Sequence, residues 1–209
     1  RYKNAKKALA TEAIFFHTYI DDLIINDSIG GTGAGNAING GEVRTMGLEL
    51  SANYDRGLHK GWSLQTPAYV AVTATRATFE TDTASDDQES IFSGSKKGNR
   101  LPYIPELVVS FGLGAIYQKW SANLDANYQT TSFADGANTG AGPNVNTRFG
   151  KIDSRLVMDA ALGYQYSNKV RIFSTMKNIT SQEYIVSRQP EGARPGAPLT
   201  IMGGIEFSL

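Results

Sequence analysis

The chain has 209 residues and equal numbers of basic and acidic side chains, 20 each, so its charge does not indicate nucleic acid or an acidic partner. Cysteine is absent, which excludes disulfides, zinc–thiolate sites and thiol nucleophiles. No signal segment opens the chain, and no run approaches the roughly 18 apolar residues of a membrane helix. Alternating barrel strands would escape a hydropathy window, and the abundance of glycine and aromatic residues favours an all-β fold.

The sequence predicts eight strands, several of them longer than the usual globular strand and close to the roughly ten residues of a tilted membrane crossing. In chain order they cover about residues 10–25, 41–54, 62–79, 107–117, 120–130, 154–166, 169–178 and 200–209.

Polar and apolar residues alternate in four of these strands. Between residues 120 and 129 one face carries Trp120, Ala122, Leu124, Ala126 and Tyr128, and the other carries Ser121, Asn123, Asp125, Asn127 and Gln129. The strands at 41–54, 154–166 and 200–209 alternate in the same way. A period of two places the two sets on opposite faces of a sheet. A soluble β-sandwich would show the same alternation.

The lengths of the connections discriminate between these folds. Short connections at 55–61, 118–119 and 167–168 alternate with long polar loops without strand patterns at 26–40, 80–106, 131–153 and 179–199. In an up-and-down sheet all short turns then lie at one end and all long loops at the other. This segregation is typical of outer-membrane barrels, which have short periplasmic turns and long extracellular loops.

Aromatic residues are predicted to form two interfacial girdles, although they are also ordinary strand formers. The band near the short turns would contain Tyr54, Trp62, Tyr117, Trp120, Tyr164, Tyr166 and Phe207. The band near the long loops would contain Phe15, Phe16, Tyr19, Phe79 and Phe133.

The C-terminal part resembles TonB-dependent outer-membrane receptors, notably the ferric-siderophore and ferric-citrate type. The resemblance is carried by the segment from Lys177 to Tyr184, by the arginine–proline–glycine run 187–198, and by the glycine-containing final strand. Three further segments are similar to the family: residues 15–22, 46–49 and 101–105. The chain ends in Leu209, where outer-membrane proteins usually end in an aromatic residue that the barrel-assembly machinery reads.

The resemblance implies a 22-stranded antiparallel up-and-down barrel, closed by an N-terminal plug that contacts TonB. Residues 1–209 would then be the C-terminal part of this barrel, without the plug and the N-terminal strands.

The sequence contains no catalytic constellation and no metal site, so we expect a protein that is not an enzyme. His17 and His59 lie far apart, and the glycine-rich segment 30–35 lacks the lysine of a phosphate-binding loop. The acidic run Asp82, Asp86, Asp87 and Glu89 has the oxygen ligands that Ca²⁺ prefers, but its spacing matches no calcium loop.

Charged residues are instead expected to serve a wet lumen and a ligand. Asp125, Asp159, Glu49 and Glu206 fall on the polar faces of their strands, where they would line the lumen and pair with plug residues. The candidate ligand-binding residues are Arg188, Gln189, Arg194, Arg148 and Arg155, because guanidinium groups suit carboxylate-rich ferric chelates. The alternative for these arginines is structural pairing with Glu183 or Glu191.

The resulting hypothesis is a receptor in the bacterial outer membrane that imports a ferric siderophore or ferric citrate. Its partners would be this cargo, TonB, outer-membrane lipid and the barrel-assembly machinery, without nucleic acid and without a cofactor. Two alternatives stay open: a complete small eight-stranded barrel with a structural or adhesion role, and a soluble β-sandwich binding module.

Overall fold

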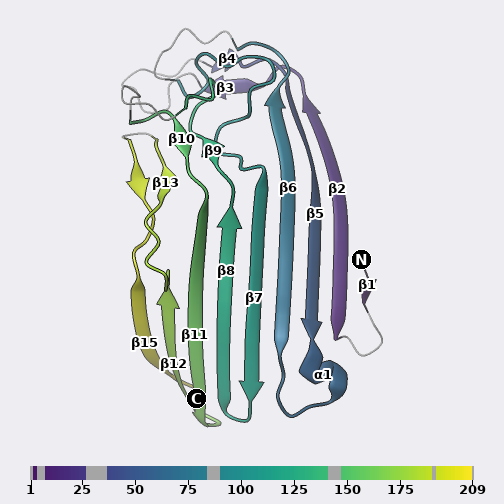
Figure 1. The fold of residues 1–209 in the computed structure, drawn as a ribbon, viewed down its shortest axis with the longest axis vertical. Coiled ribbons are helices and arrows are strands. Elements are labelled where there is room, and N and C mark those ends of the chain that lie inside the picture. Colours follow the sequence, from purple (N-terminus) through teal and green to yellow (C-terminus); the bar gives the residue numbers. More distant parts are fainter. Residues whose placement is uncertain are drawn as a thin grey trace.

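The long strands form one continuous antiparallel sheet. A computed structural model of the chain describes residues 2–3, 8–26, 37–83, 90–140, 147–189 and 192–208. Nine strands pair in the order β1-β2-β5-β6-β7-β8-β11-β12-β15 (Figure 1). Each long strand pairs with the next long strand of the chain, which confirms the predicted up-and-down arrangement.

Eight of the nine strands are long: β2 (Leu9–Ile20), β5 (Val43–Asp55), β6 (Pro67–Phe79), β7 (Leu107–Tyr117), β8 (Trp120–Gln129), β11 (Arg155–Ser167), β12 (Val170–Lys177) and β15 (Thr200–Phe207). The ninth, β1 (Tyr2–Lys3), pairs with the start of β2. Two-residue turns join β7 to β8 and β11 to β12, close to where the sequence predicts them.

The connection between β5 and β6 differs from the prediction. It contains a short helix, α1 (Arg56–Lys60), so β6 begins at Pro67 and not near Trp62. Asp55 caps the helix by accepting a hydrogen bond of 2.8 Å from the N–H of Leu58. Gly61 ends it in the left-handed conformation at φ 71°, which glycine adopts without strain. No helix in the described part of the chain is long and apolar enough to cross a membrane.

Three of the four long loops carry small two-stranded sheets, so the expectation of loops without strands is wrong. The pairs are β3 (Ile24–Asn26) with β4 (Ala37–Asn39), β9 (Ser132–Phe133) with β10 (Lys151–Ile152), and β13 (Ile185–Ser187) with β14 (Arg194–Pro195). The first long strand also ends earlier than predicted, at Ile20 and not near Ile25. Asp22 at φ 52° interrupts it before β3 begins.

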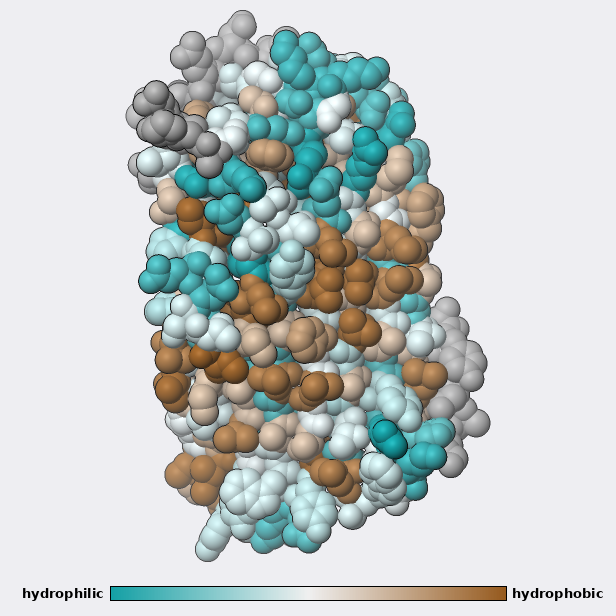
Figure 2. Space-filling view, viewed as in Figure 1, coloured by the Kyte–Doolittle hydropathy of each residue, from teal (hydrophilic) through white to brown (hydrophobic). Residues whose placement is uncertain are grey.

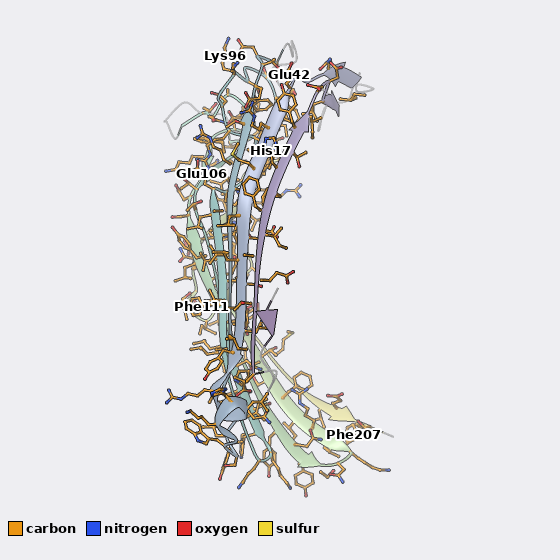
Figure 3. The ribbon with its side chains drawn as sticks, turned by 90° about the vertical axis from the view of Figure 1, so that its right-hand side faces the viewer. His17, Glu42, Lys96, Glu106, Phe111 and Phe207 are labelled. Carbon is orange, nitrogen blue, oxygen red and sulfur yellow. The ribbon has the colours of Figure 1, made fainter. Side chains whose placement is uncertain are left out.

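The sheet is bowed, and Phe111 lies on its convex side (Figure 3). The register places Val70, Ala126 and Met158 in the same row as Phe111. These residues, and every second residue from them along each strand, therefore face outward. The neighbouring row of the convex face is also apolar: Ala68, Leu113, Leu124, Ala160, Met176 and Ile201. The convex face therefore presents a hydrophobic band across the middle of the molecule (Figure 2).

The side chains of this band are unusually exposed for apolar residues. Leu113 is 56% exposed and Ile201 63%. Burying such side chains stabilises a protein by about 1.5–3 kcal/mol each, and patches beyond a few hundred Å² are rare on soluble monomers. A sheet with this surface requires an apolar medium or an apolar partner.

The opposite, concave face carries the predicted polar residues. One row across the sheet runs through Asn53, Tyr69, Gly112, Asp125 and Asp159, and Lys177 of β12 reaches Asp159 at the end of this row. The hydroxyl of Tyr69 donates to Asp125 over 2.9 Å, and Lys177 Nζ lies 2.7 Å from Asp159 Oδ2. Glu49 and Glu206 lie in the same phase of their strands, as predicted.

The aromatic prediction holds at one end of the sheet and fails in part at the other. Near the short turns the aromatic side chains are exposed, Trp120 by 59% and Tyr166 by 63%. Near the long loops Phe79 is only 1% exposed and packs edge-on against Phe92, so it belongs to a core beneath the loops and not to a girdle. Phe15, 72% exposed, and Tyr19, 43% exposed, remain as outward-facing aromatics of that band.

The topology fits neither alternative fold. The described strands form one large sheet, and its edge strands β1 and β15 do not pair with each other, whereas a closed eight-stranded barrel needs such a pairing. A β-sandwich needs a second large sheet packed on the first, and the other described sheets have only two strands each.

Candidate functional site

The long loops gather at one end of the sheet, opposite the short turns (Figure 1). We refer to these ends as the loop end and the turn end. The loop end contains the first loop (21–42), the second (80–106), the third (130–154) and the fourth (178–199). Hydrogen bonds between loops decide whether this end is a set of independent segments or one unit.

The first and second loops are joined through their strand-proximal residues. The N–H of Glu42 donates to Thr81 Oγ1 over 2.8 Å, and the N–H of Glu80 donates to the carbonyl of Glu42 over 2.8 Å. The Thr83 hydroxyl donates to the carbonyl of Gly40 over 3.1 Å. These bonds extend the pairing of β5 and β6 into the loops.

The second and third loops are joined by a reciprocal pair. The Asn138 amide accepts a bond of 2.7 Å from the N–H of Arg100 and donates one of 2.9 Å to its carbonyl. The Arg100 guanidinium donates to the carbonyl of Thr131 over 2.9 Å and lies 5.2 Å from the ring centre of Phe133. The N–H of Tyr103 donates to the carbonyl of Phe133 over 2.7 Å.

Arg188 joins the fourth loop to the second and the third. Its N–H donates to the Tyr103 hydroxyl over 3.2 Å, its Nε to the carbonyl of Lys151 over 3.1 Å, and its Nη1 to the carbonyl of Thr147 over 3.3 Å. Gln189 donates to the carbonyl of Arg148 over 3.1 Å. All four loops are therefore one hydrogen-bonded network.

The five predicted ligand residues lie together around the β13–β14 hairpin. Arg155 donates to the carbonyl of Ile185 over 3.1 Å, and its guanidinium lies 5.0 Å from the ring centre of Tyr184. Arg194 is exposed on β14, opposite Ser187 of β13. Arg188 and Gln189 follow β13 directly, and Gln189 contacts Arg148 across the loops. The structure thus brings the predicted residues into one region.

The pairing of these arginines differs from the structural alternative raised above. Arg155 and Arg188 donate to main-chain carbonyls and not to carboxylates, and neither forms an ion pair with any residue in the described ranges. Glu191 lies outside the described residues. A carbonyl satisfies the N–H groups of a guanidinium without cancelling its charge. The side chains of Arg155 and Arg188 therefore keep positive charge that an anionic ligand could neutralise.

Asn178 anchors both ends of the fourth loop, a role that sequence reasoning missed. It is 2% exposed, and its side-chain amide donates to the carbonyls of Gln182 and Ala197, each over 3.0 Å. Its side-chain oxygen accepts from the N–H of Gln182 over 2.9 Å, and its own N–H donates to Asp159 over 2.8 Å. This gives the asparagine of the C-terminal motif a physical function.

The tyrosine and the glycine of that motif meet in the same loop. The ring of Tyr184 covers Gly196, and a Cβ on Gly196 would lie 2.0 Å from Tyr184 Cζ. The N–H of Gly196 donates to the carbonyl of Tyr184 over 2.8 Å. Any larger residue at position 196 would displace the ring, so this packing requires glycine there.

The other candidate sites receive no support. Asp82, the described member of the acidic run, accepts a bond of 2.8 Å from the N–H of Lys97 and lies 3.4 Å from Lys96 Nζ. The hydrogen bond from the Lys97 N–H lowers the pKa of Asp82 from its ordinary value, and Lys96 lowers it further. Together these two effects outweigh desolvation, which raises the pKa. Asp86, Asp87, Glu89 and the segment 30–35 lie outside the described residues, within which no group of three metal-binding side chains occurs.

Solved structures share this architecture. The unliganded ferric citrate transporter FecA superposes with a TM-score of 0.71 at 22% identity, over 95% of this chain and 29% of FecA. The siderophore receptor PiuA from Acinetobacter baumannii gives a TM-score of 0.70 at 16% identity, over 99% of this chain and 27% of PiuA. The copper transporter OprC gives 0.65 at 22% identity, over 97% of this chain and 29% of OprC. This chain thus spans less than a third of the solved proteins it matches.

A bowed, up-and-down antiparallel sheet with an apolar outer face, a polar inner face and linked loops at one end has the architecture of the wall of an outer-membrane β-barrel. Residues 1–179 match the family described as TonB dependent receptor-like, beta-barrel, and the chain belongs to this family. The family consists of bacterial outer-membrane receptors and transporters and is not an enzyme family.

Proposed function

We propose that this chain is the C-terminal part of a TonB-dependent outer-membrane transporter that imports a ferric chelate, a siderophore complex or ferric citrate. The observation that carries this proposal is the pair of guanidinium groups beside the β13–β14 hairpin, those of Arg155 and Arg188, which have no carboxylate partner among the described residues. Ferric chelates of these classes are rich in carboxylate or other anionic oxygens, which guanidinium groups bind well. The likeness to FecA and PiuA agrees with this cargo class.

The membrane location is supported by the convex face. Its exposed apolar band lies between the loop end and the turn end, as the lipid contact surface of a barrel requires (Figure 2). The free edges of β1 and β15 would pair with further strands that complete the wall. TonB would act through a plug domain, and the barrel-assembly machinery would insert the protein.

Arg194 offers the sharpest test of ligand contact because its side chain is exposed and forms no hydrogen bond with any described residue. In the full receptor, Arg194→Gln should weaken binding of ferric citrate or of the cognate siderophore complex several-fold, since one charge–charge contact is lost. Lys97→Gln removes the same charge from the second loop and serves as the matched control. Binding is measured by quenching of intrinsic fluorescence, and uptake with radioactive iron in cells with and without TonB.

Two results would contradict the proposal. TonB-independent iron uptake would refute the assigned coupling to TonB, and uptake of copper but not of iron by the same cells would refute the assigned cargo. Equal affinities of wild type and Arg194→Gln would leave the transporter assignment intact but remove this arginine from the ligand site.

A further inference from the structure

The turn end has an excess of positive charge. The three short connections of the described sheet carry Arg56 and Lys60 in α1, Lys119 between β7 and β8, and Lys169 between β11 and β12. Every one of these connections therefore presents at least one cation.

The carboxylates at this end are already engaged elsewhere. Asp55 accepts hydrogen bonds from the N–H groups of Leu58 and Thr66, over 2.8 and 3.1 Å. Glu206 lies 3.5 Å from Arg171 on the concave face. None of the four turn cations forms an ion pair within the described ranges. At the loop end four cations, Lys96, Arg44, Arg100 and Lys151, each lie within 4.0 Å of a carboxylate, while Arg155 and Arg188 donate to carbonyls.

The turn cations lie beside exposed aromatic rings. The Arg56 guanidinium is 5.5 Å from the ring centre of Trp62, which is 49% exposed. Lys119 Nζ donates to the carbonyl of Tyr166 over 3.2 Å, next to the exposed ring of that residue. The adjacent Trp120 packs on Tyr164, with ring centres 4.5 Å apart.

Aromatic rings of the convex face mark its boundary at the turn end. Tyr54, Tyr117, Trp120 and Tyr164 share the outward phase with Leu113 and Leu124. The His59 ring of α1 lies 6.0 Å from the Tyr54 ring, which places the helix at this boundary. Aromatic rings prefer the depth at which hydrocarbon gives way to headgroups, so cations just beyond them lie at the depth of lipid phosphates.

We infer that the turn end is a binding surface for anionic phospholipid headgroups, with Arg56, Lys60, Lys119 and Lys169 as phosphate contacts. This inference rests on the proposed membrane location. Unpaired cations attract a phosphate, and the neighbouring rings hold the acyl-chain side of the same lipid. Phosphatidylglycerol should therefore be enriched at this boundary over a zwitterionic lipid of equal chain length.

The test uses the full receptor in phosphatidylcholine vesicles with spin-labelled phosphatidylglycerol or phosphatidylcholine as the probe. Electron paramagnetic resonance gives the relative association of the two lipids with the protein. We expect a preference of about two- to fivefold for phosphatidylglycerol that falls as NaCl is raised from 0.05 to about 0.5 M. Arg56→Gln/Lys60→Gln should reduce it, and Lys119→Gln/Lys169→Gln should reduce it further.

The double variant Lys96→Gln/Lys97→Gln removes two positive charges at the loop end and is the matched control. An unchanged preference in the turn variants, or an equal reduction in the control, would overturn the inference. Variants that no longer show the heat-dependent gel shift of a folded barrel are replaced by the single substitution Lys169→Gln. Failure of the receptor to float with the vesicles would instead refute the membrane location itself.

Discussion

The hydroxyl of Tyr69 reaches Asp125 across Gly112, and the absence of a side chain at Gly112 makes this contact possible. The three residues lie in register on β6, β7 and β8, with 2.9 Å between the Tyr69 oxygen and Asp125 Oδ1. A Cβ on Gly112 would lie 2.2 Å from the Tyr69 ring and 2.6 Å from Asp125 Oδ1. Phe16 covers Gly47 and Phe173 covers Gly204 in the same manner. On the concave face, aromatic rings thus lie over glycines of the neighbouring strands.

Gly112→Ala should destabilise the barrel by about 1–3 kcal/mol, because the added methyl must displace either the ring or the carboxylate. The matched control is Gly203→Ala on β15, where a Cβ would meet only the Phe173 carbonyl at 3.7 Å. The control should be neutral or slightly stabilising, since alanine costs less backbone entropy than glycine. Urea unfolding in lipid vesicles measures both. Equal losses of unfolding free energy in the two variants would mean that the contact between the Tyr69 ring and Gly112 does not contribute to stability.

Charge substitutions at two neighbouring residues of β8 should have different effects on the stability of the barrel. Leu124→Arg places a guanidinium in the apolar band and should cost about 2–4 kcal/mol, the midplane cost of a lipid-facing arginine. Asp125→Asn keeps an acceptor for Tyr69 and should cost about 1 kcal/mol or less. Folding titrations in vesicles distinguish the two, and similar costs would be incompatible with lipid on the convex face.

Cysteine labelling tests which end faces outward, because the chain has no native cysteine. In the full receptor, Lys97→Cys and Ala193→Cys at the loop end should react with a membrane-impermeant thiol reagent on intact cells. Ser63→Cys and Asn168→Cys at the turn end should react only after the outer membrane is opened. Gly192 is a poor choice, because its φ is 112° and a Cβ there would lie 3.0 Å from Thr147 Oγ1. The reverse labelling pattern would place the loops in the periplasm.

Asn178→Ala should release the fourth loop at both ends. The substitution removes three side-chain hydrogen bonds and leaves the carbonyls of Gln182 and Ala197 without this donor. A loss of about 1–3 kcal/mol and faster proteolysis between residues 180 and 198 are expected. Asn178→Gly tolerates the φ of 50° but lacks the amide, so it isolates the hydrogen bonds from the backbone conformation. Normal protease resistance in both variants would exclude an anchoring role.

Acid should loosen the second loop at Asp82. Because the folded-state pKa of Asp82 is lowered from its ordinary 3.8, the ionised carboxylate stabilises the loop above that value. This contribution is lost as the pH falls through the folded-state pKa. The protection factor of the Lys97 amide, measured by hydrogen exchange between pH 6 and 3, should decline accordingly. In Asp82→Ala it should be low at every pH, and a pH-dependent protection in this variant would implicate another group.

The strands were predictable where alternation and tight turns reinforce each other. β7 and β8 were placed within one residue, because Gln118 and Lys119 separate two alternating segments. The start of β6 was not predicted correctly. Trp62 has a high strand propensity, and the helix α1 that precedes it has only five residues, too few for a clear helical pattern. Asp55 and Gly61 were the signals that could have revealed the helix.

The loop residues show a different limit of sequence reasoning. The five candidate residues lie in one region of the structure, but the partners of Arg155 and Arg188 are carbonyls of Ile185, Lys151 and Thr147. Every residue has the same main-chain carbonyl group. The sequence therefore does not indicate which carbonyls of a loop will accept hydrogen bonds from an arginine side chain. Phe79 was misplaced for a related reason, since its partner Phe92 comes from a loop.

The bond between Arg188 and Tyr103 has a consequence for engineering. It spans 85 residues of sequence and joins the fourth loop to the second. A chimeric receptor that takes one loop from a relative would lose donors or acceptors supplied by the other three. To change the ligand of such a transporter, all four loops should therefore be exchanged together. The strands that receive them should keep the same register at their ends.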